Sequence, residues 1–315
     1  MDIFLLYFKE GQPAQETDPQ EIRARLGETS GPYWLSITLP KEEDLAWLGQ
    51  TWGFHPLTLD DCRTYNPRPK LEEYPSYLFL ILHEVSRDKE EFKAIDIQFY
   101  FSQEYLITIQ REESKVLGRK QERAADLSRG TDFLLYRFMN QLSEDYFVFL
   151  GIIDERIERV EEQVIARPAQ RLLHRIFLLK QNLIFLLRLV APFREILHQI
   201  NSHEYPYIGS AHQLYFRDIY NSLVFVQEMI ETQRDLTSGA LAAYMSALSN
   251  NLNEVMKRLT LIATIFMPIS FIAALGGMNF EFLPFHEPLA MWFVLVVIML
   301  LPLAMLGWFR ARNWL

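Results

Sequence analysis

The feature that most constrains this chain is a pair of long uncharged runs near its C-terminal end. Residues 259–280 (LTLIATIFMPISFIAALGGMNF) and 288–309 (PLAMWFVLVVIMLLPLAMLGWF) are each 22 residues long and contain no Asp, Glu, Lys or Arg. A helix needs about 20 mainly apolar residues to cross the hydrocarbon core of a bilayer. We therefore expect two transmembrane helices joined by an external loop, residues 281–287. Two helices buried in a soluble core are the alternative, and runs of this length fit it poorly.

The charges that flank the two runs predict how they are oriented. Lys257 and Arg258 precede the first run, and Arg310 and Arg312 follow the second, whereas the connecting loop has no basic residue. Basic residues favour the cytoplasmic side of a membrane. We expect a multi-pass protein of the cell (inner) membrane with both termini in the cytoplasm and a basic cytoplasmic tail, residues 310–315.

The rest of the chain has a different composition. Residues 1–258 carry 67 of the 71 charged side chains and the whole net charge of −9. A single cysteine, Cys62, excludes a disulfide-stabilised scaffold. The acidic balance argues against a nucleic-acid partner, because phosphate binding relies on clustered Lys and Arg. The sequence thus predicts a large cytoplasmic body attached to a two-helix membrane anchor.

The first part of the body, residues 1–130, has the pattern of an α/β domain with a mixed sheet and helices. Five short runs rich in aromatic and β-branched residues predict strands, and two segments between them predict short helices. The strands are expected at 3–8, 33–39, 77–83, 95–101 and 105–110, and the helices at 41–49 and 56–62.

Residues 131–205 have a helical pattern without strand signals, and they predict an antiparallel hairpin of two helices. Arg167 and Pro168 interrupt the pattern, and Pro192 is expected to kink the second helix. Apolar residues recur every three or four positions along the first helix. They are Phe138, Leu142, Tyr146, Phe149, Ile153, Ile157, Val160 and Val164.

A third, very long helix is expected from about residue 211 into the first membrane run, with residues 206–258 as its stalk. No proline lies between Pro206 and Pro268. One face of this helix carries no charge and combines bulky apolar residues with small or polar ones. It consists of Asn253, Met256, Leu259, Ala263, Met267, Ser270 and Ala274. Two membrane helices cannot enclose a conduit, so a pore lined by this face would need several copies in a closed ring.

The outer end of this helix reads Gly277-Met278-Asn279, and here the chain resembles the CorA family of magnesium channels and transporters. Similar family sequence occurs at 215–218 (YFRD), 253–257 (NEVMK), 263–268 (ATIFMP) and 310–315 (RARNWL). The resemblance implies a funnel-shaped homo-oligomer, with five subunits, that moves Mg²⁺ through a lipid bilayer.

The resemblance also implies roles for the residues of the long helix. A ring of Asn279 carbonyls would select hydrated Mg²⁺, which dehydrates reluctantly, by accepting hydrogen bonds from its bound waters. Gly277 would let the chain turn tightly there, Asn253 would form an inner polar ring, and Ser270 would form a hydroxyl ring between them. Hydrophobic constrictions that close the pore by dewetting would be formed by Met256, Leu259 and Met267.

Two acidic residues are candidates for a regulatory metal site between neighbouring subunits. Asp218 matches the family through its YFRD context, and Asp88 follows the strand expected at 77–83. Mg²⁺ bridging them would hold a closed symmetric arrangement, and its loss would favour conduction. A solvated surface carboxylate is the alternative for each.

Departures from the family pattern leave the transported ion open. Ala242 stands where some members have an acid, and the loop reads Leu283-Pro284-Phe285-His286-Glu287. His286 could favour Zn²⁺, Co²⁺ or Ni²⁺, whereas Met278 favours the magnesium branch. The loop acids Glu281 and Glu287 could still concentrate cations by electrostatic attraction.

Other classes of protein have little support. The sequence has no phosphate-binding glycine loop, nucleophile elbow or paired zinc-ligand motif. We therefore predict that the protein is not an enzyme. A non-conducting membrane scaffold or sensor remains as the second alternative.

Overall fold

The computed structural model describes residues 2–26, 31–118, 120–166, 169–278, 288–312 and 314. The chain forms two compact units, Met1–Leu241 and Ala242–Leu315. One helix, α8 (Ser210–Gly276), contributes residues to both units.

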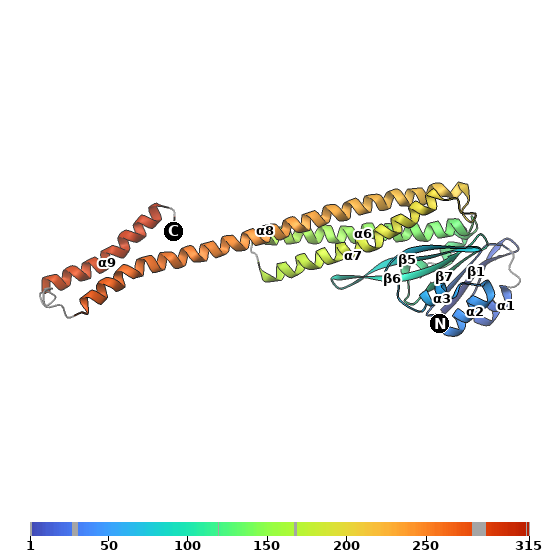
Figure 1. Ribbon diagram of the computed structural model, residues 1–315, viewed down its shortest axis with the longest axis horizontal. Helices are drawn as coiled ribbons and strands as arrows, with labels where there is room; N and C mark the ends of the chain where they lie inside the picture. The colour runs from blue at the N-terminus through green and yellow to red at the C-terminus, as the bar shows by residue number, and fades with distance from the viewer. Residues whose placement is uncertain are drawn as a thin grey trace. The chain divides into compact units, whose positions relative to one another are not determined.

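The first unit is built on a seven-stranded sheet (Figure 1). Its strand order is β2-β1-β3-β7-β6-β5-β4, and every neighbouring pair is antiparallel except β3 and β7, which are parallel. The strands are β1 (Asp2–Lys9), β2 (Gln12–Glu16), β3 (Tyr33–Thr38), β4 (Lys70–Tyr74), β5 (Tyr77–Asp88), β6 (Glu91–Phe101) and β7 (Tyr105–Gln110).

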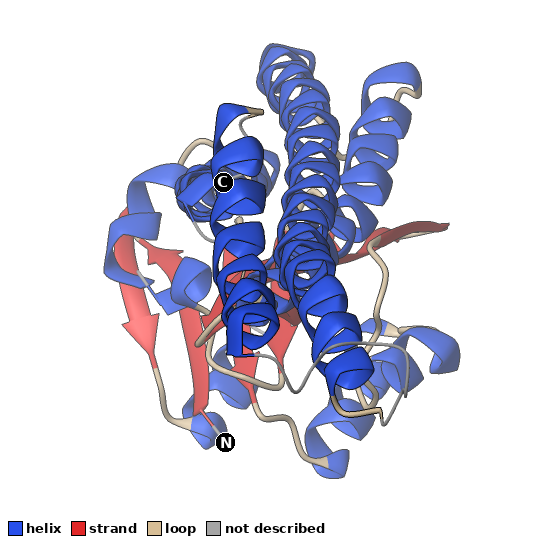
Figure 2. Cartoon of the chain, turned by 90° about the vertical axis from the view of Figure 1, so that its left-hand side faces the viewer, coloured by secondary structure: helices blue, strands red, loops and turns tan. Residues whose placement is uncertain are grey.

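Helices cover both faces of this sheet, as the red strands and blue helices of Figure 2 show. On one face lie α1 (Pro19–Arg25), α2 (Glu42–Trp52) and α3 (Pro56–Asp61), which contribute buried apolar residues to the same core as the strands. On the other face the Phe138 ring of α6 (Thr131–Ala166) lies 5.1 Å from the Trp34 ring of β3. Because both faces are covered, strands such as β5 are nearly continuous apolar runs, buried from Tyr77 to Val85.

Short helical turns connect the sheet to a long antiparallel hairpin of α6 and α7 (Gln170–Ser202). These turns are α4 (Lys115–Gly118), the 3₁₀ helix η1 (Lys120–Arg123) and α5 (Ala124–Leu127). Seven of the eight apolar residues predicted to form the stripe of α6 are buried. The eighth, Phe149, is half-buried, and its ring lies 4.9 Å from that of Phe92.

Within the first unit, one apolar face of α8 is also buried. Phe216, Ile219, Leu223, Val226 and Ile230 are all at most 1% exposed. Their spacing of three and four residues is that of a helix face packed against other helices. Further along the same face, the amide of Gln233 donates a hydrogen bond to the Leu150 carbonyl of α6, with N and O 3.1 Å apart. This bond satisfies the side-chain nitrogen of Gln233, whereas the buried Oε1 of the same side chain has no hydrogen-bond partner among the described residues.

The carboxylate of Asp132 joins the start of α6 to the start of α8. Its Oδ2 accepts a hydrogen bond from the Gly209 amide at 3.0 Å and lies 2.8 Å from His212 Nδ1. Its Oδ1 accepts from the Phe133 amide at 2.8 Å. Gly130 precedes α6 with φ of +127°, and a Cβ there would lie 2.6 Å from Asp132 Oδ1, so this position requires glycine.

The second unit contains the remainder of α8 and the helix α9 (Pro288–Ala311). Near the end of α9 the Phe309 ring stacks on that of Trp314, with centroids 5.9 Å apart. The Arg312 guanidinium lies 5.8 Å from the Trp308 ring. This basic aromatic cluster is the kind of anchor that favours a membrane–water interface.

Among the described residues, three helices are long and apolar enough to cross a membrane: Gln170–Ser202, Ser210–Gly276 and Trp292–Ala311. They differ in how much of the apolar window is already buried within the chain. That share is 44% for α7 but only 6% for α8 and for α9. The apolar residues of α7 thus belong largely to the core of the first unit, whereas those of α8 and α9 are available to lipid or to other chains.

The predicted fold class, a mixed α/β domain followed by long helices and apolar C-terminal helices, is confirmed. The five expected strands and two expected short helices are all present, with end points that differ by a few residues. Strands β2 and β4 and helix α1 were not predicted. Both strands lie at the edges of the sheet and expose most of their side chains at least in part, so their sequences lack the apolar signal of the inner strands.

Candidate ion pathway and regulatory residues

The uncharged face predicted on the long helix is wholly exposed in the single chain. Every residue from Asn253 to Ala274 on that face is exposed, and Met256, Leu259 and Met267 expose 59%, 58% and 72% of their surface. All seven lie on α8, in the second unit. No other described part of the chain therefore covers this face.

The opposite side of the same helix is the covered one. Between residues 251 and 278, six residues are buried or half-buried. They are Leu261, Ile265, Pro268, Ile269, Ile272 and Leu275. At about 100° per residue these six cluster on the side away from Met256 and Met267. The chain thus leaves the face that contains Asn253 and Ser270 to water, lipid or another copy.

The helix ends at the first residues of the Gly277-Met278-Asn279 motif. The last residue of α8 is Gly276. The amide of Gly277 donates hydrogen bonds to the carbonyls of Ala273 and Ala274, each at 3.1 Å, and Met278 is 53% exposed. Gly277 is not in the left-handed region, and a Cβ there would meet the Ala274 carbonyl oxygen at an ordinary 3.5 Å. At position 277 itself, backbone conformation and space would accept another residue, and the role of Gly277 in the turn that follows stays a prediction.

Part of the predicted site lies outside the described residues. This holds for Asn279 and for the loop residues Glu281, His286 and Glu287. Their roles in selecting or attracting cations stay predictions.

Asp88 lies at the tip of the hairpin formed by β5 and β6, and its side chain is 51% exposed. The carboxylate forms an ion pair with Lys93 on the next strand. An incoming cation would compete with this ammonium group for the same carboxylate oxygens.

Asp218 lies on α8 in the first unit, within the YFRD segment. Phe216 is fully buried, Tyr215 accepts a hydrogen bond from Arg129 at 3.2 Å, and Asp218 itself is exposed. Burial raises the pKa of Tyr136, and the nearby charge of Asp218 acts in the same direction. The aromatic residues of the segment thus fix the helix, while the carboxylate remains open to solvent.

A single chain does not assemble a metal centre from these acids. Among the described residues, no group of three or more His, Cys, Asp and Glu side chains is arranged to hold a metal ion. A site that uses Asp88 and Asp218 would require ligands from a second subunit.

Comparison with known proteins decides the family. The sequence profile of the CorA-like Mg²⁺ transporter protein family matches residues 29–311. The cobalt/magnesium transport protein CorA of Thermotoga maritima is 35% identical over 300 residues, which cover 91% of this chain and 85% of that protein. The chain belongs to the CorA family. CorA proteins are membrane transporters, and the prediction that this protein is not an enzyme is confirmed.

Further relatives show how widely the CorA family extends. A putative metal ion transporter of Bacillus subtilis, YfjQ, is 32% identical over 287 residues, covering 90% of this chain and 89% of that protein. The zinc transport protein ZntB of Yersinia enterocolitica is 20% identical and covers 90% of this chain and 88% of its own length. The CorA magnesium transporter structure from Methanocaldococcus jannaschii shares the fold, with a TM-score of 0.85, 20% identity and coverage of 100% and 99%.

The residues that could have suggested catalysis are structural in this CorA protein. The Cys62 thiol is buried and donates to the Thr58 carbonyl, and burial raises its pKa to about 12, so a nucleophilic thiolate is disfavoured. His83 is 1% exposed, and one ring nitrogen is hydrogen-bonded to the Asn66 carbonyl. Burial lowers the pKa of His83, which keeps the ring neutral.

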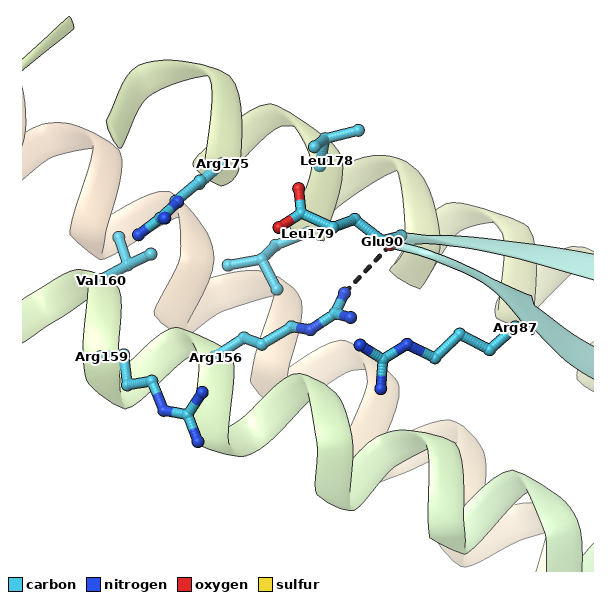
Figure 3. Close-up of a pocket in the computed structure, with 8 residues that line it drawn as sticks. All are labelled: Arg87, Glu90, Arg156, Arg159, Val160, Arg175, Leu178 and Leu179. Carbon is cyan, nitrogen blue, oxygen red and sulfur yellow. Dashed lines mark hydrogen bonds between the residues drawn. The ribbon is translucent and has the colours of Figure 1, made fainter. Parts of the chain in front are cut away.

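A group of arginines in the first unit of this CorA protein is not anticipated from the sequence. Arg87, Arg156, Arg159 and Arg175 line one cavity of about 200 Å³ in the first unit (Figure 3). Arg156 and Arg159 are one helical turn apart, which is a weak signal in the sequence. The other two come from distant segments, so only the fold brings the four together.

Proposed function

We propose that this protein is a homo-oligomeric channel that carries hydrated Mg²⁺ across the cell membrane through a pore lined by α8. The observation that carries the proposal is the uncharged face from Asn253 to Ala274, whose residues are all exposed and which, between Leu261 and Leu275, lies opposite the covered side of the helix. A ring of copies would place these faces around a common axis. Membership of the CorA family and the cobalt/magnesium transport named for the Thermotoga maritima relative support this ion class.

The residues of this face suit an ion that keeps its water. Mg²⁺ holds its hydration shell tightly, so amide and hydroxyl oxygens can recognise the bound waters without replacing them. In the proposed pore Asn279 forms the outer selective ring, Ser270 a hydroxyl ring and Asn253 an inner ring. Met256, Leu259 and Met267 form constrictions between them that exclude water when narrow.

The topology proposed for the subunit has two membrane spans, 259–280 and 288–309, with both termini in the cytoplasm. Basic residues precede the first run and follow the second, at the ends away from the connecting loop, and a basic aromatic cluster lies near Arg312. Both features support this orientation. Five copies, the number that the family resemblance implies, would form the ring. The cytoplasmic domain 1–130, hairpin 131–205 and stalk 206–258 would form the funnel.

Mg²⁺ uptake into liposomes that contain the purified protein tests the pore. We expect uptake to be blocked by cobalt hexaammine, a mimic of hydrated Mg²⁺, and Asn279→Ala to lose selective uptake. Asn251→Ala is the matched control, because Asn251 is an exposed amide of α8 that does not belong to the uncharged face. Full selective uptake by the Asn279 variant would refute the selectivity ring, and absence of uptake by a well-folded oligomer would favour a non-conducting scaffold.

We further propose that cytoplasmic Mg²⁺ bound between Asp218 of one subunit and Asp88 of its neighbour favours the closed state. The exposed carboxylates of both residues support this, and Mg²⁺ would have to displace Lys93 from Asp88. Currents should become less sensitive to internal Mg²⁺ in Asp218→Ala, but not in Asp235→Ala, an exposed acid further along α8. Unchanged Mg²⁺ dependence in the first variant would contradict this site.

Transport of Zn²⁺, Co²⁺ or Ni²⁺ is the second candidate, and the likeness to the zinc transport protein ZntB supports it. A competition series with these metals against Mg²⁺ uptake separates the candidates. If Mg²⁺ is the cargo, the other ions should inhibit only at higher concentrations than Mg²⁺ itself needs for uptake.

A further inference from the structure

A cavity in the first unit gathers an unusual number of arginines. It lies between the tip of the β5–β6 hairpin and the two helices α6 and α7, as Figure 3 shows. Arg87 and Glu90 come from the hairpin, Arg156 and Arg159 from α6, and Arg175 from α7. With four arginines and one glutamate, the lining carries a net charge of +3.

Most of this positive charge is not neutralised within the chain. Arg159 forms an ion pair with Glu155 at 3.1 Å, but both side chains are about two-thirds exposed, so the pair is weak. Among the described residues, no carboxylate lies within ion-pair distance of Arg87, Arg156 or Arg175. Instead Arg87 donates to the Lys89 carbonyl, and Arg175 donates to the Gln163 side chain at 3.2 Å.

The hairpin tip that completes the cavity is held firmly in place. The buried Asn182 of α7 donates to the Glu90 carbonyl at 2.9 Å and accepts from the Phe92 amide at 3.2 Å. Arg156 Nη1 donates to the same Glu90 carbonyl at 3.0 Å, drawn as the dashed line in Figure 3. These bonds fix Arg87 beside Arg156 although their charges repel. Burial lowers the pKa of Arg156, and the charges of Arg87 and Arg159 lower it further, whereas the charge of Glu90 acts in the opposite direction.

The size and lining of the cavity limit what can occupy it. About 200 Å³ is below the usual range for a drug-sized ligand, roughly 300–1,000 Å³, so a small group is expected. Guanidinium groups from three elements offer donors from several directions, which suits the oxygens of a tetrahedral phosphate better than a planar carboxylate. Val160, Leu178 and Leu179 form an apolar wall on one side of the cavity, while Arg87, Arg159 and Arg175 remain exposed to solvent.

We propose that this cavity is a binding site for a phosphate group, held by Arg87, Arg156, Arg159 and Arg175. The phosphate belongs either to a free anion, such as inorganic phosphate or diphosphate, or to the headgroup of an anionic lipid. The bound anion neutralises the arginines and fastens the β5–β6 hairpin to the α6–α7 hairpin. The proposal is independent of the ion that the pore carries.

The free-anion arm uses the full-length protein in nanodiscs of phosphatidylcholine, titrated calorimetrically with inorganic diphosphate in Mg²⁺-free buffer. The test variant is Arg156→Gln/Arg175→Gln. The control is Arg171→Gln/Arg188→Gln, which removes the same charge from exposed positions of α7 that do not line the cavity. We expect the test variant to bind at least about tenfold more weakly and the control to match the parent.

The lipid arm measures how much phosphatidic acid stays bound when nanodiscs that contain it are exchanged into phosphatidylcholine. Loss of retention in the test variant but not in the control identifies a lipid headgroup, whereas loss of diphosphate binding alone identifies a free anion. If neither ligand distinguishes the test variant from the control, the proposal is wrong. Arg156→Lys, which keeps the charge but not the fork of donors, guards against misfolding and should show an intermediate loss.

Discussion

The two units of this protein treat apolar surface in opposite ways. In the first unit the stripe of α8 from Phe216 to Ile230 is at most 1% exposed, and the seven-stranded sheet has helices on both faces. In the second unit the same helix exposes Met256, Leu259 and Met267 by more than half. One continuous helix thus has a stripe that the same chain buries in the first unit and an apolar surface that the same chain leaves exposed in the second.

The difference shows where the fold is incomplete as a single chain. Large contiguous apolar surfaces on soluble monomers are rare and usually indicate a membrane or protein contact. On α9 the exposed residues include Trp292, Phe293, Met299 and Leu303, each at least 63% exposed. The first unit therefore needs no partner to bury its core, whereas the second leaves its apolar surface to lipid or to other chains.

The comparison between the two units is tested most directly by the same substitution, Leu→Ala, on α8 in each unit. Leu223→Ala removes a fully buried side chain and should lower the free energy of unfolding by about 2–5 kcal/mol. Leu259→Ala, at 58% exposure, should lower it by less than about 1 kcal/mol. Thermal unfolding of the full-length protein followed by far-UV circular dichroism measures both. Equal shifts would mean that Leu259 is packed as tightly as Leu223, and would contradict a face that borders an aqueous path.

A smaller effect is expected where α8 begins. Asp132→Ala leaves the Gly209 amide and His212 without their shared acceptor, and should cost about 1–3 kcal/mol. Hydrogen exchange at the Gly209 amide should become faster. Asp132→Asn retains one carbonyl oxygen and serves as the intermediate case. Unchanged exchange in the alanine variant would show that this carboxylate does not fix the start of the helix.

The smallest effect concerns a carboxylate on α6. Burial raises the pKa of Asp145, and the charges of Glu84 and Glu144 raise it further. Because the folded pKa is above the unfolded one, stability falls as pH rises from the unfolded pKa through the folded pKa. Asp145→Asn should therefore raise the melting temperature slightly near neutral pH, with a gain that shrinks in acid.

The control for this prediction is Glu158→Gln, which removes an exposed acid from the same helix. It should show no gain that depends on pH in this way. A gain from Asp145→Asn that grows as the pH is lowered would contradict the assigned direction of the shift.

The fold could be predicted from the sequence wherever burial leaves a periodic signal. The stripe from Phe138 to Val164 gave α6, and the aromatic and β-branched runs gave the five inner strands. Strand β2 reads QPAQE and β4 reads KLEEY, both at sheet edges. Their pairing comes from the adjoining hairpins; Glu10 and Gly11 both have positive φ, as a two-residue turn of this kind requires. Local composition alone does not reveal such strands.

The candidate functional residues likewise divide into those that local periodicity predicts and those that only the packed fold brings together. The spacing of Asn253, Met256, Leu259 and Met267 placed them on one helix face, because such a face depends only on local periodicity. The arginine-lined cavity was not predictable, since Arg87, Arg156 and Arg175 come from three segments that only the packed fold brings together. The pairing of Asp88 with Lys93 likewise depends on the strand register.

The parallel pairing of β3 with β7 has a consequence for how the protein is made. Tyr33 pairs with Tyr105, so the two halves of the sheet can join only after about 110 residues have been synthesised. Such a long-range closure is intrinsically slow. The first membrane run begins roughly 150 residues later, which at 5–20 residues per second leaves about 7–30 s. We expect the sheet to be complete on the ribosome before the first membrane-bound segment emerges.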